Sequence, residues 1–400
     1  MSLDTAEKVD ILGGAAQYDI CRGCGGTASR VRDDVGRWIY PAVRPDGRKI
    51  ALLKVLFTNA CDNDCAYCVN RRDRNTRRVG FRAPELARLF ERLQRRGLVQ
   101  GLFLSSGICN SPDRMMERMI ITTEIIRFKH RFRGYVHLKI LPGASFSIVE
   151  RAVQLADRVS INLEAPNASR LSRITTKKDI EHDILTRMKW ADKCIQEKTG
   201  SRTTQTTQFV VGASEESDHE ILETAVGLYQ EMHLKRAYFS AFQPVPDTPL
   251  EHHAATPPLR EHRLYQADFL LRQYDFRFGE LVFDGNGNLP SYADPKSAWA
   301  HRHPELFPVE VNQASREELL RVPGIGPISA DRIVSLRTKG SFRSLRDLRG
   351  LRVVTSRVAP FILLNGKRPP VQLPLWNREP AAQSVEAAAT ATSHANAGCL

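Results

Sequence analysis

Residues 50–68, IALLKVLFTNACDNDCAYC, place an apolar segment directly before three closely spaced cysteines. Residues 50–58 have the length and apolar content of a buried strand. Cys61, Cys65 and Cys68 follow it at CxxxCxxC spacing. Thiolates are the usual ligands of iron–sulfur clusters. Because a four-iron cluster has four irons to ligate, three cysteines would leave one iron open to a small chelating molecule.

The segment 50–58 is the first of several apolar segments that alternate with amphipathic helical segments up to about residue 243. The expected strands are residues 50–58, 101–105, 135–140, 158–163, 206–211 and 236–242. No hairpin signal separates them. The pattern therefore predicts an α/β domain with a parallel sheet, either open or curled as a partial barrel.

Several of these strands carry a polar face. Ser160, Asn162 and Glu164 alternate with apolar residues, and His137 and Lys139 do the same. A buried parallel strand is normally apolar throughout. The alternation therefore favours a lumen that holds a ligand. Antiparallel strands with one face in water are the alternative, and the intervening helices weigh against it.

A second distinctive segment is residues 312–337, NQASREELLRVPGIGPISADRIVSLR. Ser315 and Glu318 fit a capping box at the start of one helix, and a second helix is expected from about Pro327. Glycines between the two let the backbone approach a phosphate, and N–H groups at a helix start favour anions. The residues expected to contact a phosphate here are Arg321, Gly324, Ile325, Gly326 and Arg332.

The charge balance favours a polyanionic partner. The 400 residues contain 58 Lys and Arg against 45 Asp and Glu, a net charge of +13. Residues 309–368 alone hold 12 basic and five acidic residues. Such clustering is typical of nucleic-acid binding. A second basic cluster, residues 71–78, adjoins the cysteines, and we expect Arg71 and Arg72 to contact phosphates. A solvated surface is the alternative for that cluster.

The strand followed by CxxxCxxC resembles the radical S-adenosylmethionine (radical SAM) superfamily. The resemblance implies a 4Fe–4S cluster on Cys61, Cys65 and Cys68, with SAM chelating the fourth iron and releasing a 5′-deoxyadenosyl radical that abstracts hydrogen from the substrate. It also implies a reductant protein such as flavodoxin or ferredoxin. The cofactor contacts implied are Tyr67, Ser105, Ser106, Gly107, Ser160, Asn162, Glu164, Val211 and Gly212. The sequence SSG at 105–107 departs from the family's glycine-rich turn. Candidate catalytic residues are Cys109, His137, Lys139 and Tyr238.

The segment 312–337 resembles the helix–hairpin–helix motif of DNA repair and recombination proteins. From about residue 7 to 367 the chain is similar to a family of radical SAM proteins assigned to DNA modification or repair. That resemblance implies a partial (β/α)6 radical SAM barrel with a small all-α helix–hairpin–helix domain at the C-terminus. The implied substrate is a nucleotide in DNA, held by backbone contacts that carry no sequence specificity.

Two alternatives stay open. RNA could replace DNA, because backbone contacts alone do not distinguish the sugars. The chain could also be a non-catalytic DNA-binding protein with a closed iron–sulfur or zinc site. In a zinc site, Cys21 and Cys24 from the segment CRGC would join Cys65 and Cys68 as ligands. In a closed iron–sulfur cluster, Cys21 or Cys24 would be the fourth ligand.

The expected organisation has five parts. They are an N-terminal helical extension with CRGC (1–48), the barrel (49–275), an irregular connector (276–308), the helix–hairpin–helix domain (309–368) and a disordered tail (369–400) rich in Ala, Ser and Thr. No apolar run reaches membrane-spanning length and no secretion signal is visible. The eight cysteines are therefore expected to be thiols or metal ligands in the cytoplasm. The oligomeric state is not indicated.

Overall fold

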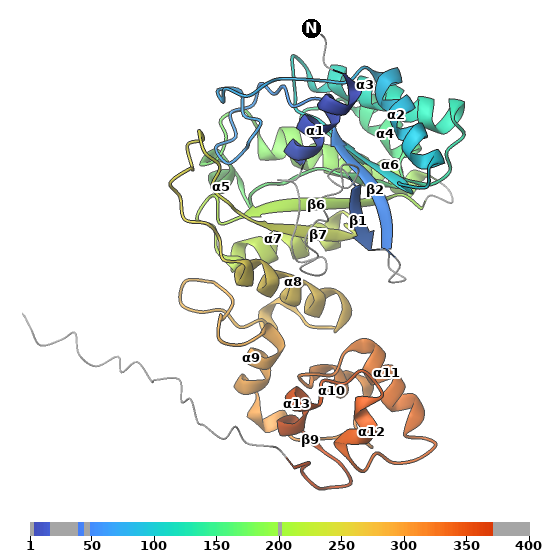
Figure 1. The fold of residues 1–400 in the computed structure, drawn as a ribbon. Helices are drawn as coiled ribbons and strands as arrows, with labels where there is room; N and C mark the ends of the chain where they lie inside the picture. Colours follow the sequence, from blue (N-terminus) through green and yellow to red (C-terminus); the bar gives the residue numbers. More distant parts are fainter. Residues whose placement is uncertain (1–3, 17–38, 44–48, 199–201, 371–400) are drawn as a thin grey trace, which may run out of the picture. The chain divides into compact units, whose positions relative to one another are not determined.

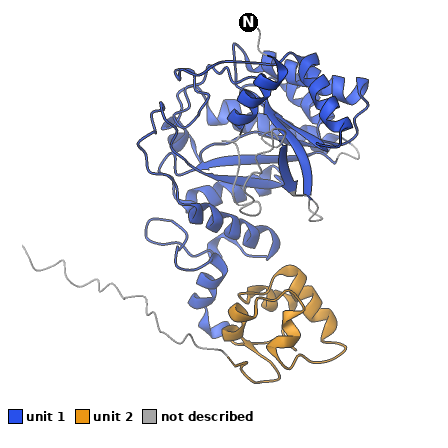
Figure 2. Ribbon diagram, viewed as in Figure 1, with its two compact units in different colours: residues 1–306 blue, residues 307–400 orange. Residues whose placement is uncertain are grey.

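The computed structural model describes residues 4–16, 39–43, 49–198 and 202–370. The chain forms two compact units, residues 1–306 and 307–400, shown in different colours in Figure 2. Cys21, Cys24 and nearly all of the expected tail lie outside the described residues. Within the described ranges, no helix has both the length and the apolar character needed to cross a membrane.

The first unit is built on a curled seven-stranded sheet, visible in Figure 1. Its strands lie in chain order: β1 (Ile39–Val43), β2 (Lys49–Leu56), β3 (Gly101–Ser105), β4 (Tyr135–Lys139), β5 (Arg158–Ser160), β6 (Thr204–Val211) and β7 (Arg236–Ala241). Neighbours from β2 to β7 are parallel, and β1 pairs with β2 in antiparallel fashion. Parallel neighbours in chain order require a crossover between them, and helices supply most of these crossovers.

All six expected strands are present, and the α/β half-barrel is confirmed. The observed bounds differ from the expected ones by up to three residues, the largest difference being at the end of β5. The expectation of a purely parallel sheet was wrong at the edge, because β1 was not predicted. Pro41 lies inside β1, and proline is tolerated in a sheet at an edge strand.

The crossover segments contain helices of very different length. They are α2 (Ala83–Arg95), α3 (Pro112–Glu124), α4 (Phe146–Leu155), α5 (Ala168–Ser172), α6 (Thr186–Glu197), α7 (Asp218–Glu231) and, after β7, α8 (Pro258–Gln273). The π-helical turns η3 (Ile125–Lys129) and η4 (Ile180–Leu185) adjoin α3 and α6. Before the sheet, α1 (Thr5–Ala15) packs on β2. Ser111 and Ser217 cap α3 and α7 by accepting backbone N–H bonds, which fixes where these helices begin.

The segment expected to be an irregular connector contains helix α9 (Pro295–Arg302) and the short turns η5 (Phe278–Glu280) and η6 (Pro304–Leu306). Asp294 caps α9 by accepting from the Ser297 N–H. Trp299 is buried against Phe276, with ring centroids 5.3 Å apart. Apolar contacts of this kind explain why a Gly- and Pro-rich segment is ordered here.

The second unit is mostly helical. It contains α10 (Arg316–Arg321), α11 (Pro327–Leu336), α12 (Leu345–Arg349), α13 (Thr355–Val358) and the single turn η7 (Ala359–Phe361). Strands β8 (Val309–Glu310) and β9 (Ile362–Leu363) form a short parallel pair, so this unit is not strictly all-α. The helices form two hairpins, α10–α11 and α12–α13. The core of the unit is formed by apolar side chains from both hairpins, among them Leu319, Ile333, Leu348 and Val358.

Candidate active site

The three cysteines of the CxxxCxxC segment lie in a loop at the carboxyl end of β2. None of them is in a disulfide; Cys65 is buried, and Cys61 and Cys68 are half-buried. Backbone bonds hold this loop to two neighbouring loops: Asp62 N–H donates to Ile108 O (2.7 Å), and Ala66 N–H donates to Ile174 O (2.7 Å). The loops after β3 and β5 therefore fix the position of the cysteines.

Gly107, in the loop after β3, packs against the start of the cysteine loop. A Cβ at residue 107 would lie 2.2 Å from Ala60 O and 3.1 Å from Cys61 Cβ. Its N–H donates to Thr58 O (2.8 Å). The glycine at this position is thus required by close packing against the start of the loop. Of the two residues before it, Ser105 is buried and the Ser106 hydroxyl donates to Gly107 O.

Burial has the largest effect on the pKa values of Cys65 and Cys68. It raises the pKa of Cys65, and it raises the pKa of Cys68 to about 12, with Cys65 and Cys61 adding further to the rise at Cys68. The three thiols are thus close enough to influence one another. A thiol in such surroundings stays protonated unless a positive centre stabilises the thiolate, which is what metal coordination does.

Three thiols in one loop are the donor set that a 4Fe–4S cluster uses. Among the described residues, no three Cys, His, Asp or Glu side chains are placed to hold one metal ion. Ligands of a four-iron cluster bind different irons and need not converge on one point. Nearby, Asn162 Oδ1 is buried with no hydrogen-bond partner in the described part of the chain, as expected of a group that awaits a ligand.

A buried ion pair lies beside the cysteines. Lys178 Nζ is 3.0 Å from Glu164 Oε1, and Asn162 Nδ2 donates to Glu164 Oε2 (3.4 Å). Burial, followed by Glu164, raises the pKa of Tyr67 well above its usual range. Burial alone would lower the pKa of Lys178, but Cys65 and Glu164 outweigh it and raise the pKa. Tyr67, Asn162 and Glu164 were expected to bind the cofactor, and the structure brings them together. Lys178 was not predicted.

The remaining expected cofactor residues lie in two other places. Ser160 is buried, and its hydroxyl is 2.8 Å from His137 Nε2 on the inner face of the sheet. Gly212 has φ +88°, and a Cβ there would lie 2.0 Å from Thr256 Oγ1. The Thr256 hydroxyl also donates to Val211 O (2.7 Å). The segment that leads into α8 therefore packs against the backbone of Val211 and Gly212 and restricts its conformation.

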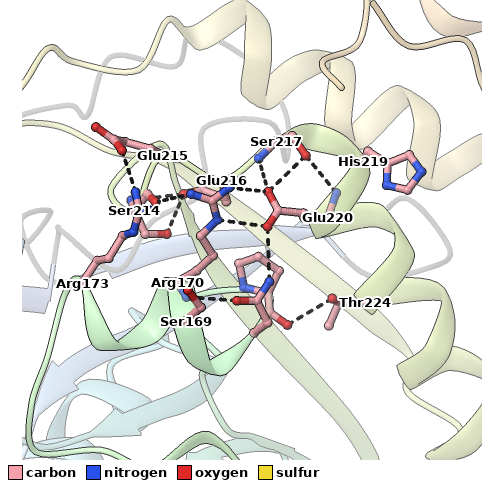
Figure 3. Close-up of polar contacts among 12 residues, drawn as sticks. Ser169, Arg170, Arg173, Ser214, Glu215, Glu216, Ser217, His219, Glu220 and Thr224 are labelled. Carbon is pink, nitrogen blue, oxygen red and sulfur yellow. Dashed lines mark hydrogen bonds and ion pairs between the residues drawn. The ribbon is translucent and has the colours of Figure 1, made fainter. Parts of the chain in front are cut away.

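Contacts between α5 and α7 secure the loops on this side of the sheet, as Figure 3 shows. The Arg170 guanidinium donates to both carboxylate oxygens of Glu220 (2.9 and 3.0 Å) and to Ser214 O. Arg173 pairs with Glu215 (2.6 Å). The network joins the segment after β5, which carries Glu164 and Lys178 at its two ends, to the segment after β6.

Cys109 lies outside this group. It lines a cavity of about 180 Å³ together with Phe57, Phe81, Arg114 and Met115, between the starts of α2 and α3. Asn110 Nδ2 is 3.4 Å from its sulfur. Lys139 and Tyr238, the other catalytic candidates, lie on β4 and β7.

The basic cluster after the cysteines is largely engaged within the chain. Arg71 and Arg72 both pair with Asp73, at 2.9 and 3.1 Å. Arg74 and Arg78 donate to backbone carbonyls. Arg72 keeps about half of its side chain exposed and remains placed for an external contact.

The glycine turn of the second unit packs against the second hairpin. Gly324 has φ +90°, and a Cβ there would lie 2.9 Å from Val354 O. The Val354 N–H donates to Gly324 O (3.1 Å). Ile325 has a buried side chain, and its N–H donates to Val322 O (3.2 Å). Gly326 is the N-cap of α11 and Arg332 is exposed on that helix, whereas Arg321 is half-buried.

Two family models match the chain. Residues 55–226 match the radical SAM superfamily, whose members use a 4Fe–4S cluster and SAM. Residues 307–357 match the helix-hairpin-helix motif. A search of the curated proteins found no match.

The chain is also similar to solved structures. The FeFe-hydrogenase maturase HydG from Carboxydothermus hydrogenoformans has a TM-score of 0.45 and 14% identity, over 55% of this chain and 51% of that one. Methylornithine synthase (PylB) has a TM-score of 0.45 and 11% identity, over 55% and 61%. Coproporphyrinogen III oxidase (HemN) from Escherichia coli has a TM-score of 0.37 and 13% identity, over 55% and 52%.

The chain thus spans about half to three fifths of the length of these structures. The family match falls on the segment from within β2 to within α7, which contains the cysteine loop and the buried ion pair. The second match falls on the two helical hairpins. The chain therefore carries a domain of the radical SAM superfamily, followed by a helix-hairpin-helix motif.

Proposed function

We propose that this chain is a radical SAM enzyme that modifies or repairs a nucleotide in DNA. The observation that carries the proposal is the presence in one chain of the three-cysteine loop and of the helix–hairpin–helix unit. Cys61, Cys65 and Cys68 would hold the cluster, and bound SAM would supply the 5′-deoxyadenosyl radical. A protein reductant such as flavodoxin or ferredoxin would supply the electron, and the proposed location is the cytoplasm.

The surroundings of the cysteines support a place for SAM. Glu164 and Asn162 offer acceptors, Tyr67 offers a ring beside Cys68, and Lys178 offers a buried positive charge suited to a carboxylate. Hydrogen abstraction needs a substrate carbon next to the radical. Since a base stacked in a duplex is out of reach, the target nucleotide would be extruded or single-stranded.

The helix–hairpin–helix unit supports DNA as the polymer. Helix α11 begins at the glycine turn, and the backbone N–H groups at a helix N-terminus are suited to donate hydrogen bonds to a phosphate. Such contacts are not sequence-specific and weaken steeply with salt. RNA is the second candidate, because these contacts do not read the sugar.

The test is an anaerobic reconstitution of the full chain with iron and sulfide. Release of 5′-deoxyadenosine under reducing conditions, increased by DNA, is the expected result. Cys65→Ser should abolish the release. The matched control is Cys194→Ser, because Cys194 is buried in α6 and is not part of the cysteine loop. A wild-type chain that carries its cluster but never cleaves SAM would contradict the proposal that the protein is a radical SAM enzyme.

The choice of polymer needs a separate measurement. Deuterium transfer from uniformly labelled DNA and from labelled RNA into 5′-deoxyadenosine distinguishes the two substrates. Transfer from DNA supports the proposal, and transfer from RNA alone replaces it with the second candidate. A fourth cysteine ligand on the cluster, with a cluster spectrum that SAM does not change, would favour the non-catalytic alternative.

A further inference from the structure

The cavity lined by Cys109 lies on the helix side of the sheet, where α2, α3 and α4 pack (Figure 1). Phe57, just after β2, and Met115 of α3 both line it. Its wall also includes Ala60, the residue before the first cysteine of the loop, Cys61. None of the residues proposed to contact SAM is among those that line it. The cavity therefore adjoins the cluster ligands without being part of the proposed SAM site.

Two arginines bring positive charge to this cavity. Arg114 and Arg118 lie one turn apart on α3, and both line the cavity and are exposed. Neither guanidinium has a hydrogen bond or ion pair with another described residue. Glu117, exposed on the same helix, pairs with neither of them. Like charges four residues apart destabilise a helix slightly, and an acidic partner would offset that repulsion.

The acidic side chains close to the cavity are engaged by backbone groups. Asp62 Oδ2 accepts from the Asn110 N–H (2.6 Å), and Asp113 Oδ1 accepts from the Ser145 N–H (2.7 Å). No Asp or Glu is among the described residues that line the cavity. The lining is therefore positively charged, with two guanidinium groups open to solvent.

Exposed apolar side chains follow the two arginines along the same helix. Ile121 comes three residues after Arg118 and is 47% exposed, and Phe128, in the π-helical turn η3 that continues α3, is 71% exposed. Residues three or four apart are neighbours on a helix, so Arg114, Arg118 and Ile121 lie on one side of α3. We call Arg114, Arg118, Ile121 and Phe128 the α3 surface. Arginine beside exposed apolar and aromatic groups is typical of protein–protein contacts, whereas phosphates need only cations and polar donors.

The need for an electron gives this surface a specific kind of partner. Cleavage of SAM requires one electron at the cluster, and the carrier that delivers it has to approach the cluster without occupying the place of SAM or substrate. The Asp62 N–H donates to Ile108 O, so the loop that carries Cys109 lies directly against the cysteine loop. Electron-transfer complexes bury little surface, less than about 1,200 Å². Two arginines and a few apolar residues are enough for such a contact.

We infer that the α3 surface docks an acidic electron-carrier protein, which delivers one electron to the cluster beside Ala60. In this step the carrier is oxidised by one electron and the cluster is reduced by one, and no proton or chemical group is transferred. The inference rests on the proposed function for the presence of a redox-active cluster, although binding of the carrier can be measured without SAM cleavage. DNA phosphates are the other polyanion in the proposed function, and the experiment distinguishes them.

The experiment follows electron transfer from a reduced acidic flavodoxin to the reconstituted full chain by stopped-flow absorbance, without SAM or DNA. The rate should fall steeply as salt is added, because opposite charges steer association. Arg114→Gln and Arg118→Gln should each lower the rate about threefold and the double variant about tenfold, while Arg118→Lys retains most of it. Ile121→Ser should weaken flavodoxin binding severalfold in an equilibrium titration. Reduction by dithionite, a small ion that needs no docking surface, should be equal in all variants.

The matched control is Arg96→Gln. Arg96 is exposed at the end of α2, just before β3 begins, and so lies at the opposite edge of the sheet from the cysteine loop. Equal slowing in Arg96→Gln and Arg118→Gln, or an unchanged rate in the double variant, would overturn the inference. Weaker DNA binding by the double variant at an unchanged flavodoxin rate would also overturn it and would assign the surface to nucleic acid. Failure of dithionite to drive SAM cleavage in the same samples contradicts the proposed function alone.

Discussion

Lys178 and Glu164 form an ion pair of 3.0 Å in which both side chains are less than one tenth exposed. The pair lies beside Cys65 and Cys68, whose thiols influence the pKa of Lys178. Two buried charges of opposite sign are tolerated because each satisfies the other. Lys178 is therefore the positive charge that balances Glu164 and, when a cluster is bound, the thiolates around it.

Replacing Lys178 with methionine should remove this balance and leave Glu164 buried without its partner. We expect a loss of about 3–5 kcal/mol in the free energy of unfolding and a lower iron content after reconstitution. Urea unfolding and iron and sulfide analysis measure the two effects. Lys177→Met is the matched control, because Lys177 is exposed. The double variant Lys178→Met with Glu164→Gln should recover stability; if it does not, the ion pair is not the cause.

Arg78 positions the cysteine loop. Its guanidinium donates to Asn59 O (2.7 Å) before the cysteines and to Asn70 O (2.9 Å) and Arg74 O (3.0 Å) after them. One side chain thus fixes both ends of the segment that contains the cluster ligands.

Arg78→Gln should lower iron retention severalfold and destabilise the chain by about 3 kcal/mol, since hydrogen bonds to charged groups are worth about 1.5–3 kcal/mol each. The cluster's visible absorption and its EPR signal report the loss directly. Arg77→Gln is the control, because the neighbouring Arg77 is exposed and has no side-chain bond among the described residues. Equal iron content in the two variants would contradict a positioning role for Arg78.

The sequence allowed the strands and the cysteine loop to be predicted, because both depend on short-range patterns. Six apolar segments and one CxxxCxxC spacing were enough to place Cys65 at the carboxyl end of β2. Strand β1 was missed, although Pro45-Asp46-Gly47 between β1 and β2 is a turn signal. A five-residue edge strand with a central proline carries little periodic signal, and its partner strand provides most of its stability.

Tertiary contacts were harder to predict. Lys178 is 14 residues from Glu164 in the sequence, and nothing local in the pair of lysines at 177 and 178 shows which one is buried. Gly107 was expected to contact the cofactor, which stays a prediction, but the sequence did not show that a Cβ at this position would lie 2.2 Å from Ala60 O. Both depend on how the loops after β2, β3 and β5 pack together, and that packing has no signature in any single segment.

Glu220 links stability to pH. Its hydrogen bond with Arg170, the largest contribution, lowers the pKa of this carboxyl to about 2, below the ordinary value of 4.5 (Figure 3). A lowered pKa in the folded state means that the stabilisation is complete above about pH 4.5. It is lost as the pH falls towards 2.

Glu220→Gln should therefore lower the free energy of unfolding near neutral pH by about 1–2 kcal/mol, a figure reduced because the pair is partly exposed. The difference between variant and wild type should shrink as the pH falls from about 4.5 towards 2. Urea midpoints measured along this pH range test the sign. Glu223→Gln, at an exposed position on α7, should show almost no difference. A difference that grows in acid would contradict the assignment.

Gly324 couples the two hairpins of the second unit. Gly324→Ala places a Cβ 2.9 Å from Val354 O in a backbone conformation that only glycine adopts readily, so we expect a loss of about 2–4 kcal/mol and weaker DNA binding. Gly340→Ala, where a Cβ meets open space, should change neither the stability nor the DNA binding.

Arg332→Gln should separate DNA binding from folding. We expect the affinity for DNA to fall and its dependence on salt concentration to weaken, with a slope smaller by about one, while the free energy of unfolding stays unchanged. An unchanged salt slope in Arg332→Gln would mean that DNA contacts another face of this unit.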